Sequence, residues 1–560
     1  MNRELRGKLD QVINRLWGGG ITDPVTYIEQ LSYLIYLKLL DEEEANRELQ
    51  ASMLGNGMTR SLFPDQADRF RWSNWRFRSG DDLMKFLRDE VFPYMASLVR
   101  EEPQVAEYFR DAVLEITDAN LLKFVVDELD QIDFRRLGTD TKGDIFEYFL
   151  THHLGQSALN GQFRTPRQIR TMMVQMVDPD LGDTIFDPAA GTGGFLIDAV
   201  EHILAKYSSE PKAVPIYGEE WLDRRGQTIE DAKAQIPTLQ TYRKGDPDLL
   251  PHGGWERLER SIYGFDVSRK VMRIAVMNLV LHNVRNANVK RANSLSEYGG
   301  LSEDDLRRCY QVILSNPPFA GVLPQDSIRR DLPTKAKKSE LLFLGLILQS
   351  LAPGGRCAVV VPEGLLFGST GAHVELRRKL LHEFDLQAVI SLPAGVFKPY
   401  AGVKTGVLLF RRPQNPSVLR NTEKVWFYEV RADGYDPDKI AGGGRPETPE
   451  SNDIPDLLRH WQAYKSSGFA SPPGPESGAI LVPGSDAPRC WWAPAALIES
   501  NEYALAASRY KPQVAHEALA ENPVDLVCQV LELEQQITVG LEALLEDLQS
   551  ERVAAARQAL

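Results

Sequence analysis

Residues 310–319 read YQVILSNPPF, an apolar run that ends in the tetrapeptide Asn316-Pro317-Pro318-Phe319. The apolar half has the length and β-branched content of a buried strand, so we expect Asn316 at the carboxyl end of that strand. Open α/β sheets bind their ligands at this edge. The stretch therefore predicts an α/β sheet with its functional site at Asn316.

The tetrapeptide carries the groups that an exocyclic amine needs as partners. Consecutive prolines lock φ and have no N–H, so they hold only acceptors in a fixed orientation. The amide oxygen of Asn316 and the carbonyl of Pro317 can each accept one N–H of a planar NH₂ group, and Phe319 offers a face on which a base can stack. An ordinary strand that ends in a proline turn is the competing interpretation, because Asn-Pro-Pro is also common turn chemistry.

Composition limits the class of protein. The 560 residues suffice for roughly two to four domains, and 43% hydrophobic with 25% charged residues is ordinary for a soluble globular chain. We expect a cytoplasmic protein without a membrane role, because the sequence has neither an apolar run of about 18 residues nor a signal peptide. The four cysteines lie far apart and no histidines cluster, so the sequence predicts no metal site and no disulfide framework.

The formal net charge is −14. Phosphate binding draws on clustered lysine and arginine, so any contact with DNA must be local or shared with a partner. One local cluster follows the tetrapeptide and consists of Arg329, Arg330, Lys335, Lys337 and Lys338. It could hold a DNA backbone, and the alternative is a solvated charged loop.

Residues 1–138 are expected to form a helical N-terminal domain. Asp23-Pro24 reads as an N-cap followed by proline at the first helical position, and apolar residues recur densely after it. Trp72, Trp75 and Phe77 lie among arginines in this region. They indicate either a nucleic-acid surface or, as we favour, a packed loop with arginines that extend to solvent.

Between residues 139 and 412 short apolar runs alternate with helical stretches, which is typical of a doubly wound α/β sheet. We expect this segment to be the catalytic domain. Its last two strands lack a long helix between them and are expected to form an antiparallel edge pair. The seven expected strands are 184–186, 261–265, 289–291, 311–314, 356–361, 387–392 and 406–410.

The remaining residues divide into two segments. Residues 413–510 are rich in proline, glycine and aspartate and are expected to form a loop-rich extension. Residues 511–560 predict a helical region for subunit association. Its apolar positions Leu526, Val530, Leu533 and Ile537 are spaced by three and four, which slightly favours docking on a partner helix over packing on the chain's own domain.

Residues 186–196 read FDPAAGTGGFL and follow the first expected strand. Their glycines let the backbone turn tightly and approach a ligand closely. The loop has neither the G-x-G-x-x-G fingerprint nor a lysine for a triphosphate, so it indicates a ligand without phosphates. Asp266 ends the next strand and supplies the carboxylate that such folds use to hold ribose hydroxyls. Residues 217–220, YGEE, look similar, but no comparable helix follows them.

Taken in order, seven segments resemble the DNA-methyltransferase (modification) subunit of type I restriction-modification systems. The resemblance implies a class I methyltransferase-like, seven-stranded doubly wound sheet, with a helical N-terminal domain and a helical C-terminal tail. The segments are GQFRTPR at 161–167, the loop at 187–195, MNL at 277–279, NPPF at 316–319, residues 334–343, VPEGLLF at 361–367 and SLPAGVF at 391–397.

The resemblance also implies the reaction, which is methyl transfer from S-adenosylmethionine to the exocyclic amine of adenine in DNA. Asn316, Pro317, Pro318 and Phe319 would be catalytic. Asp266 stands where the family more often has Glu, and Asn293 where it often has Asp near the cofactor's adenine. The implied cofactor-binding residues are Gln162, Phe163, Arg164, Thr165, Pro166, Arg167, Asp187, Gly191, Thr192, Gly193, Gly194, Asp266 and Asn293.

The implied partners are double-stranded DNA, a specificity subunit that binds two copies of this chain, and a restriction nuclease subunit. The target base would be flipped out of the duplex and stack on Phe319. Three alternatives remain: methylation of a glutamine side chain or a cytosine amine, a self-contained DNA methyltransferase, and a non-catalytic scaffold of the same fold. The insertion between Gly194 and Asp266 has no role that the sequence indicates.

Overall fold

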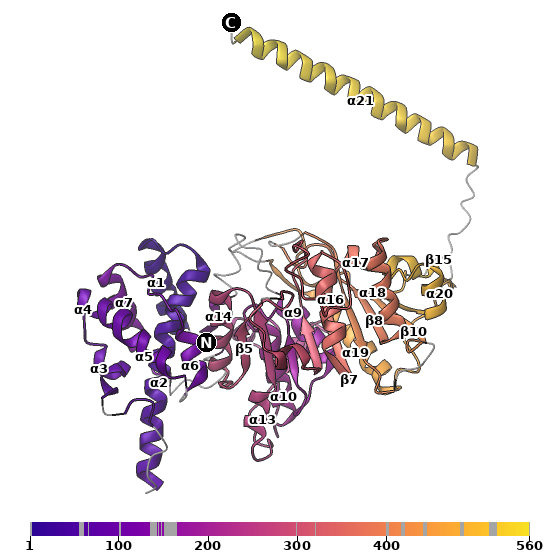
Figure 1. The fold of residues 1–560 in the computed structure, drawn as a ribbon. Coiled ribbons are helices and arrows are strands. Elements are labelled where there is room, and N and C mark those ends of the chain that lie inside the picture. Colours follow the sequence, from indigo (N-terminus) through magenta and orange to yellow (C-terminus); the bar gives the residue numbers. More distant parts are fainter. Residues whose placement is uncertain are drawn as a thin grey trace. The chain divides into compact units, whose positions relative to one another are not determined.

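The computed structural model places two compact units in the chain, which Figure 1 draws in sequence colours. One comprises Met1–Ser477 with Arg489–Lys511, and the other comprises Gly478–Pro488 with Pro512–Leu560. The structure describes residues 3–54, 61–64, 66–99, 102–134, 143, 145–146, 148–150, 165–297, 299–319, 321–398, 402–415, 420–440, 445–481, 486–514 and 523–558.

The N-terminal part of the larger unit is helical, as predicted. Asp23 caps helix α2 because its carboxylate accepts from the N–H and the hydroxyl of Thr26 at 3.0 and 2.7 Å. The buried side chains Ile28, Leu31 and Leu34 then place α2 inside a helical core. The elements are α1 (Arg3–Gly18), α2 (Pro24–Leu54), η1 (Asp68–Phe70), α3 (Trp72–Trp75), α4 (Gly80–Phe86), η2 (Leu87–Val91), α5 (Phe92–Ser97), α6 (Pro103–Phe109) and α7 (Ala119–Asp130).

The aromatic residues near α3 belong to this core. Trp72 and Trp75 are buried, and the indole N–H of Trp72 donates to Asp130 over 2.8 Å. Arg76 forms an ion pair with the same carboxylate at 2.7 Å. Only Phe77 of the three aromatic residues is exposed, so the packing interpretation holds for both tryptophans.

A nine-stranded sheet forms the centre of the larger unit, in the order β14-β10-β8-β9-β7-β6-β1-β4-β5. The half from β7 to β5 is parallel, whereas β9 runs antiparallel to both β7 and β8. The strands are β1 (Ile185–Asp187), β4 (Ile262–Asp266), β5 (Asn288–Arg291), β6 (Tyr310–Ser315), β7 (Leu351–Pro362), β8 (Asp385–Ser391), β9 (Thr405–Arg411), β10 (Lys424–Glu429) and β14 (Cys490–Pro494).

All seven expected strands are present, but their number and the position of the last pair need correction. β8 and β9 are antiparallel as predicted, yet they are not at the edge, because β10 and β14 extend the sheet beyond them. The segment 413–510 is therefore not simply a loop-rich extension. Its run Val425–Tyr428 is fully buried, which explains why it pairs with β8.

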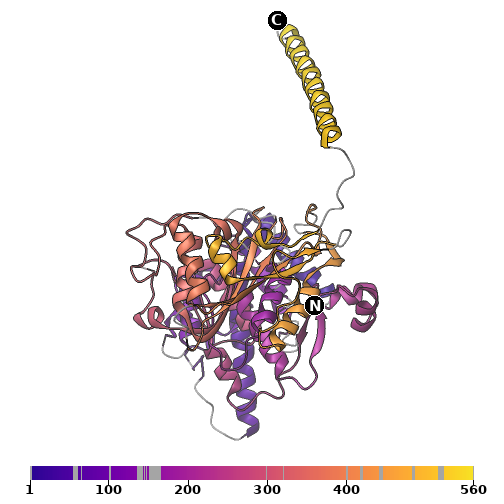
Figure 2. The same cartoon turned by 90° about the vertical axis from the view of Figure 1, so that its right-hand side faces the viewer.

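Helices cover both faces of the sheet (Figures 1 and 2). Side chains of β10 alternate: Trp426 and Tyr428 join one core, while Phe427 joins the other. Burial on both faces explains the continuous apolar runs in the sequence. The first core includes α9 (Arg167–Val177), α10 (Gly194–Lys206), α13 (Gly254–Arg260) and α19 (Ile454–Ser466). The second includes α16 (Ser339–Ser350), α17 (Glu363–Phe367), α18 (Gly371–His382), α20 (Ala495–Ser500) and η5 (Ala507–Tyr510).

Helix α14 (Arg269–Leu281) joins the helical N-terminal part to the sheet. The guanidinium of Arg273 on α14 pairs with the Glu29 carboxylate on α2 at 2.7 Å, and both side chains are buried. Arg273 also donates to the carbonyl of Tyr108 over 3.0 Å. Separating the two parts would leave each of these buried charges without its partner, and an uncompensated buried charge strongly destabilises a protein. The contact therefore holds the helical N-terminal part against α14.

The insertion between Gly194 and Asp266 packs against a hairpin from the C-terminal half of the larger unit. The phenol of Tyr217 donates to the carbonyl of Gly434 over 2.9 Å, and Thr238 donates to the carbonyl of Pro449 over 2.7 Å. The insertion contains β2 (Lys212–Pro215), α11 (Glu220–Arg225), α12 (Ile229–Gln235) and β3 (Thr241–Lys244), and the hairpin contains β11 (Asp433–Tyr435) and β12 (Glu447–Asn452).

The smaller unit consists of a short parallel pair, β13 (Ile480–Leu481) with β15 (Gln513–Val514), and the long helix α21 (Pro523–Gln558). The side chains of Val530, Leu533 and Ile537 on α21 are all more than half exposed. Within the described residues, every helix is too short or too polar to span a bilayer.

Candidate functional site

Four neighbouring strands bring the predicted site residues to one edge of the sheet. β6, β1, β4 and β5 are adjacent and parallel, so their carboxyl ends meet. Asn316 follows β6, Asp187 ends β1, Asp266 ends β4, and Asn293 lies two residues after β5. The edge is where open α/β sheets bind ligands.

Asn316 is 9% exposed, and its two amide atoms have different surroundings. The nitrogen donates to the hydroxyl of Thr165 over 2.9 Å. The oxygen is buried and has no hydrogen-bond partner among the residues that the structure describes. A buried acceptor without a donor costs about 1–3 kcal/mol, so this oxygen is available to a donor from outside the described residues.

Ser315 and Asp187 join the catalytic strand to the glycine-rich loop. The Ser315 hydroxyl and the N–H of Ala189 both donate to Oδ1 of Asp187, at 2.7 and 3.0 Å. Asp187 is only 1% exposed, and burial raises the pKa of its carboxyl to about 7 although these two donors lower it. Sequence reasoning missed Ser315, because nothing in the sequence relates it to a carboxylate 128 residues away.

The glycine-rich loop lies beside Asp266. Gly191 and Gly193 have φ of 54° and 79°, a region that side chains disfavour, so glycine is required at both positions. The N–H of Gly191 donates to Oδ2 of Asp266 over 3.2 Å, and the N–H of Ser268 donates to Oδ1 over 2.7 Å. Burial raises the pKa of Asp266 to about 6. These contacts bring together two segments that sequence reasoning chose separately.

The two prolines and Phe319 extend from the strand toward its rim. Pro317 is buried and Pro318 is exposed. The ring of Phe319 is half-buried and meets the ring of Phe397 edge to face, with centroids 5.7 Å apart. Because Phe397 lies in the SLPAGVF segment, two of the quoted motifs meet here.

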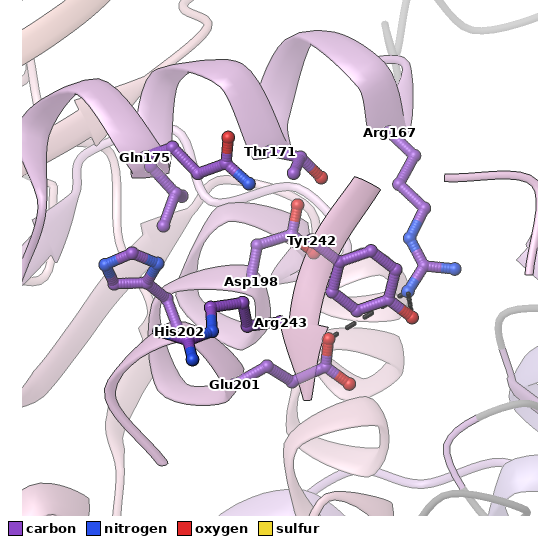
Figure 3. A pocket seen from close by; sticks show the side chains of 9 residues that line it. Arg167, Thr171, Gln175, Asp198, Glu201, His202, Tyr242 and Arg243 are labelled. Carbon is purple, nitrogen blue, oxygen red and sulfur yellow. Dashed lines mark hydrogen bonds and ion pairs between the residues drawn. The ribbon is translucent and has the colours of Figure 1, made fainter. Parts of the chain in front are cut away.

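The GQFRTPR segment is described only in part. Gln162, Phe163 and Arg164 lie outside the described residues. Pro166 is the N-cap of α9, which follows directly. The guanidinium of Arg167 donates to the phenol of Tyr242 over 2.7 Å and lies 3.9 Å from the Glu201 carboxylate, in a small polar cavity beside α9 (Figure 3).

Asn293 uses its side chain in a local turn. Its amide oxygen accepts from the N–H of Leu295 over 3.1 Å. The next residue, Ser294, donates to the carbonyl of Pro188 over 2.6 Å and so connects this turn to the glycine-rich loop. Asn293 thus lies next to a residue that contacts the glycine-rich loop, with one lone pair of its oxygen already engaged.

Residues 137–227 and 249–518 match the family described as N-6 DNA Methylase, and residues 5–129 match the HsdM N-terminal domain. The chain belongs to the N-6 DNA methylases. The EcoEI methylase subunit of Escherichia coli, from a type I restriction enzyme, is 32% identical over 425 residues, 73% of this chain and 74% of that protein. The EcoKI methylase subunit of Escherichia coli K12 is 26% identical over 441 residues, 77% and 72% of the two chains.

A solved structure gives the same assignment. A chain from work on complex assembly and conformational transition of the type I R-M system superposes with a TM-score of 0.63 at 26% identity, covering 98% of this chain and 99% of that chain. This N-6 DNA methylase is the methylase subunit of a type I restriction-modification system and a site-specific adenine DNA methyltransferase.

The basic cluster after the tetrapeptide needs one correction. Arg329 is only 5% exposed, pairs with Asp331 at 2.6 Å and donates to the carbonyl of Ser294 over 3.1 Å. Its guanidinium is therefore engaged inside the fold, which favours a structural role over contact with a DNA backbone. The other members of the cluster are exposed: Arg330, Lys335, Lys337 and Lys338.

Membership of the N-6 DNA methylases implies S-adenosylmethionine as cofactor, and the described residues fit it. A Cβ at Gly191 would meet no described atom within 4 Å, so the loop borders open space. The carboxylate of Asp266, an acceptor group, lies beside it. Among the described residues, no three histidine, cysteine or acidic side chains gather as a metal would require.

Sequence reasoning quoted Asn278 of this methylase only within the MNL segment and gave it no role of its own. Its side chain is buried in α14, and its nitrogen donates to the carbonyl of Thr192 over 3.1 Å. This hydrogen bond therefore holds the backbone of the glycine-rich loop against α14. An asparagine inside the apolar run MNLVL was the signal that could have indicated this role, because a buried polar side chain needs a partner.

Proposed function

We propose that this methylase transfers a methyl group from S-adenosylmethionine to the N6 amine of an adenine flipped out of duplex DNA, with Asn316 as the principal catalytic residue. The buried oxygen of Asn316, which has no hydrogen-bond partner in the described part of the chain, carries the proposal. Asn316 Oδ1 and the Pro317 carbonyl would each accept one N–H of the amine and so direct its lone pair outward. Fixed acceptors act without reorganisation during the reaction.

The bound cofactor supplies an electrophilic methyl group on its sulfonium, so the protein needs to align and polarise the amine more than to activate it. The amine nitrogen would form a bond to the methyl carbon as the sulfur–methyl bond breaks, with that electron pair left on a neutral thioether. The methylated amine would then release one proton to water. Phe319, supported by Phe397, would stack on the flipped base and offset part of the unstacking energy. Asp266 would accept from the ribose hydroxyls, and the glycine-rich loop would face the rest of the cofactor.

Specific methylation would need a partner. The chain carries a formal net charge of −14, and the exposed basic residues after the tetrapeptide number four. Such a cluster neutralises few phosphates, so duplex binding by the chain alone would be weak and without sequence preference. We propose that a specificity subunit binds α21 of two copies of this chain and reads the sequence, and that a restriction nuclease subunit joins the complex. A DNA substrate would place this complex in the cytoplasm.

The test compares Asn316→Ala with wild type in complex with the specificity partner. Methyl transfer to a cognate duplex should fall by orders of magnitude, while calorimetry should find nearly unchanged cofactor affinity, because Asn316 would act on the amine in the transition state. Asn74→Ala, at an exposed asparagine on α3, is the matched control. Equal loss of cofactor binding and transfer would make Asn316 a structural residue and refute the proposal.

A further inference from the structure

Asn316 and Thr165 are 151 residues apart in the chain, yet their side chains form a buried hydrogen bond of 2.9 Å. We propose that Thr165 is a positioning residue for methyl transfer, which orients the Asn316 amide so that its oxygen meets the adenine amine. The inference rests on the proposed role of Asn316. It gives Thr165 a function beyond the cofactor contact expected for its segment.

The orientation of an asparagine amide decides what it can do. Its two ends have nearly the same shape, but one accepts and the other donates. If the amide were turned by 180°, its NH₂ group would face the N–H bonds of the substrate amine, and two donors cannot bond to each other. The Thr165 hydroxyl occupies the nitrogen of Asn316 and leaves the oxygen for the amine.

Thr165 is itself held in place by a buried ion pair. Arg170 on α9 donates to the Thr165 carbonyl over 3.3 Å. The same guanidinium pairs with Asp198 on α10 through two contacts of 3.0 and 3.2 Å, and both side chains are almost fully buried. A bidentate pair of this kind has little freedom. The backbone of Thr165, which carries the hydroxyl, is thus held by a residue that joins two packed helices.

Ser315 and Asn316 are therefore tied to different segments in front of the sheet. Ser315 donates to Asp187 of the glycine-rich loop, and Asn316 donates to Thr165 at the start of α9. The strand end that carries the catalytic amide is fixed on two sides. The Asp187 contact fixes the backbone nearby, and the Thr165 hydroxyl, as the acceptor in its contact, engages the nitrogen end of the amide.

A cofactor role and a positioning role for Thr165 predict different kinetics. If the hydroxyl served the cofactor, its removal would weaken cofactor affinity and leave the rate at saturating cofactor unchanged. If it orients Asn316, its removal lowers the rate of methyl transfer at saturating cofactor and leaves cofactor affinity nearly unchanged. The second pattern is the one we expect.

The experiment uses the full chain in complex with its specificity partner and a duplex that contains the cognate site. Thr165→Val removes the hydroxyl at nearly constant volume, and Thr165→Ser keeps it. Thr171→Val is the matched control, because Thr171 is buried like Thr165 but lies within α9, where it lines the cavity around Arg167. Single-turnover methyl transfer and cofactor binding are measured for each, together with thermal unfolding. Thr165→Ala replaces Thr165→Val if the latter does not fold.

We expect Thr165→Val to slow transfer about tenfold or more, as the loss of one oriented hydrogen bond would, with cofactor affinity within about threefold of wild type. Thr165→Ser and Thr171→Val should retain the rate within about threefold. Adding Thr165→Val to Asn316→Ala should cause no further loss, because Thr165 acts through Asn316.

Three results would overturn the inference: a wild-type rate in Thr165→Val, weakened cofactor binding with an unchanged saturating rate, or equal slowing in Thr165→Ser. A slow Asn316→Ala beside a normal Thr165→Val removes the role of Thr165 alone. A normal rate in Asn316→Ala would instead remove the proposed function, and the inference with it.

Discussion

The Ser315 hydroxyl donates to the Asp187 carboxylate over 2.7 Å, so the residue before Asn316 is joined to the glycine-rich loop. Both side chains are buried. The contact connects β6 and β1 at the edge where the reaction is proposed to occur. We therefore expect the alignment of the amine and the methyl donor to depend on this hydrogen bond as well as on the proposed catalytic residues.

Ser315→Ala should destabilise the chain by about 1–3 kcal/mol, because it leaves a buried carboxylate with one donor fewer. It should also raise the pKa of Asp187 further, since the Ser315 hydroxyl lowers it. Denaturant unfolding measures the first effect. Ser315→Ala should also lower the methylation rate. Ser261→Ala is the control for this effect, because it removes a buried hydroxyl just before β4, at the opposite edge of the sheet. Equal methylation rates in both variants would show that the Asp187 contact does not serve catalysis.

The buried Asp187 makes stability depend on pH. Burial raises the pKa of its carboxyl from 3.8 to about 7, so between these values the folded chain binds a proton that the unfolded chain has released. The protonated carboxyl therefore contributes to the free energy of unfolding in full below pH 3.8. This contribution, at most about 4 kcal/mol, is lost as the pH rises to 7. Asp187→Asn should flatten the dependence. Urea unfolding from pH 5 to 8, at about one-unit steps, tests it; identical slopes for the variant and wild type would contradict it.

Asp266→Ala should weaken affinity for S-adenosylmethionine by about 1–3 kcal/mol, through loss of a charge-assisted hydrogen-bond pair, with a smaller effect on turnover at saturating cofactor. Because burial raises the pKa of Asp266 to about 6, wild-type affinity should also fall as pH drops below 6 and the carboxylate is protonated. Calorimetry at pH 5 and about 8 measures both effects. Glu219→Ala is the control, and a loss of affinity there instead would identify the YGEE segment as the ribose ligand.

Sequence reasoning succeeded where the signal is local. The β-branched run before Asn316 and the glycines at 191 and 193 each have a short-range meaning, and the strand end and the positive φ angles follow from it. It failed where the partner is distant. β10 and β14 were missed because their aromatic runs lie among loop-forming residues and become strands only by pairing with β8 and with each other.

The same distinction applies within the site. Motif order indicated Thr165, Asp187 and Asn316, but not which of them touch. Arg329 appeared to be a DNA contact because charge in a sequence suggests exposure, whereas Asp331, only two residues later, neutralises it in the folded chain. Contacts such as that of Asn278 with Thr192 depend on how α14 packs, which spacing does not reveal.

The last prediction concerns α21, which belongs to the smaller unit and exposes Val530, Leu533 and Ile537. Several large apolar side chains on one helix in water favour a partner helix. If that partner is the proposed specificity subunit, removal of residues from about 515 onward should abolish sequence-specific methylation. Cofactor binding should persist, because the described cofactor-site residues lie in the larger unit.

Point variants test the same prediction without truncation. Leu533→Glu combined with Ile537→Glu should prevent co-purification with the specificity partner, whereas Gln535→Glu, which adds charge on the opposite side of the helix, should not. Gel shifts with cognate and scrambled duplexes then compare the purified complexes, and calorimetry checks that each chain still binds the cofactor. The isolated full-length chain should bind both duplexes weakly and alike. Tight, selective binding by that chain alone would refute the two-subunit interpretation and place the recognition surface within residues 413–510.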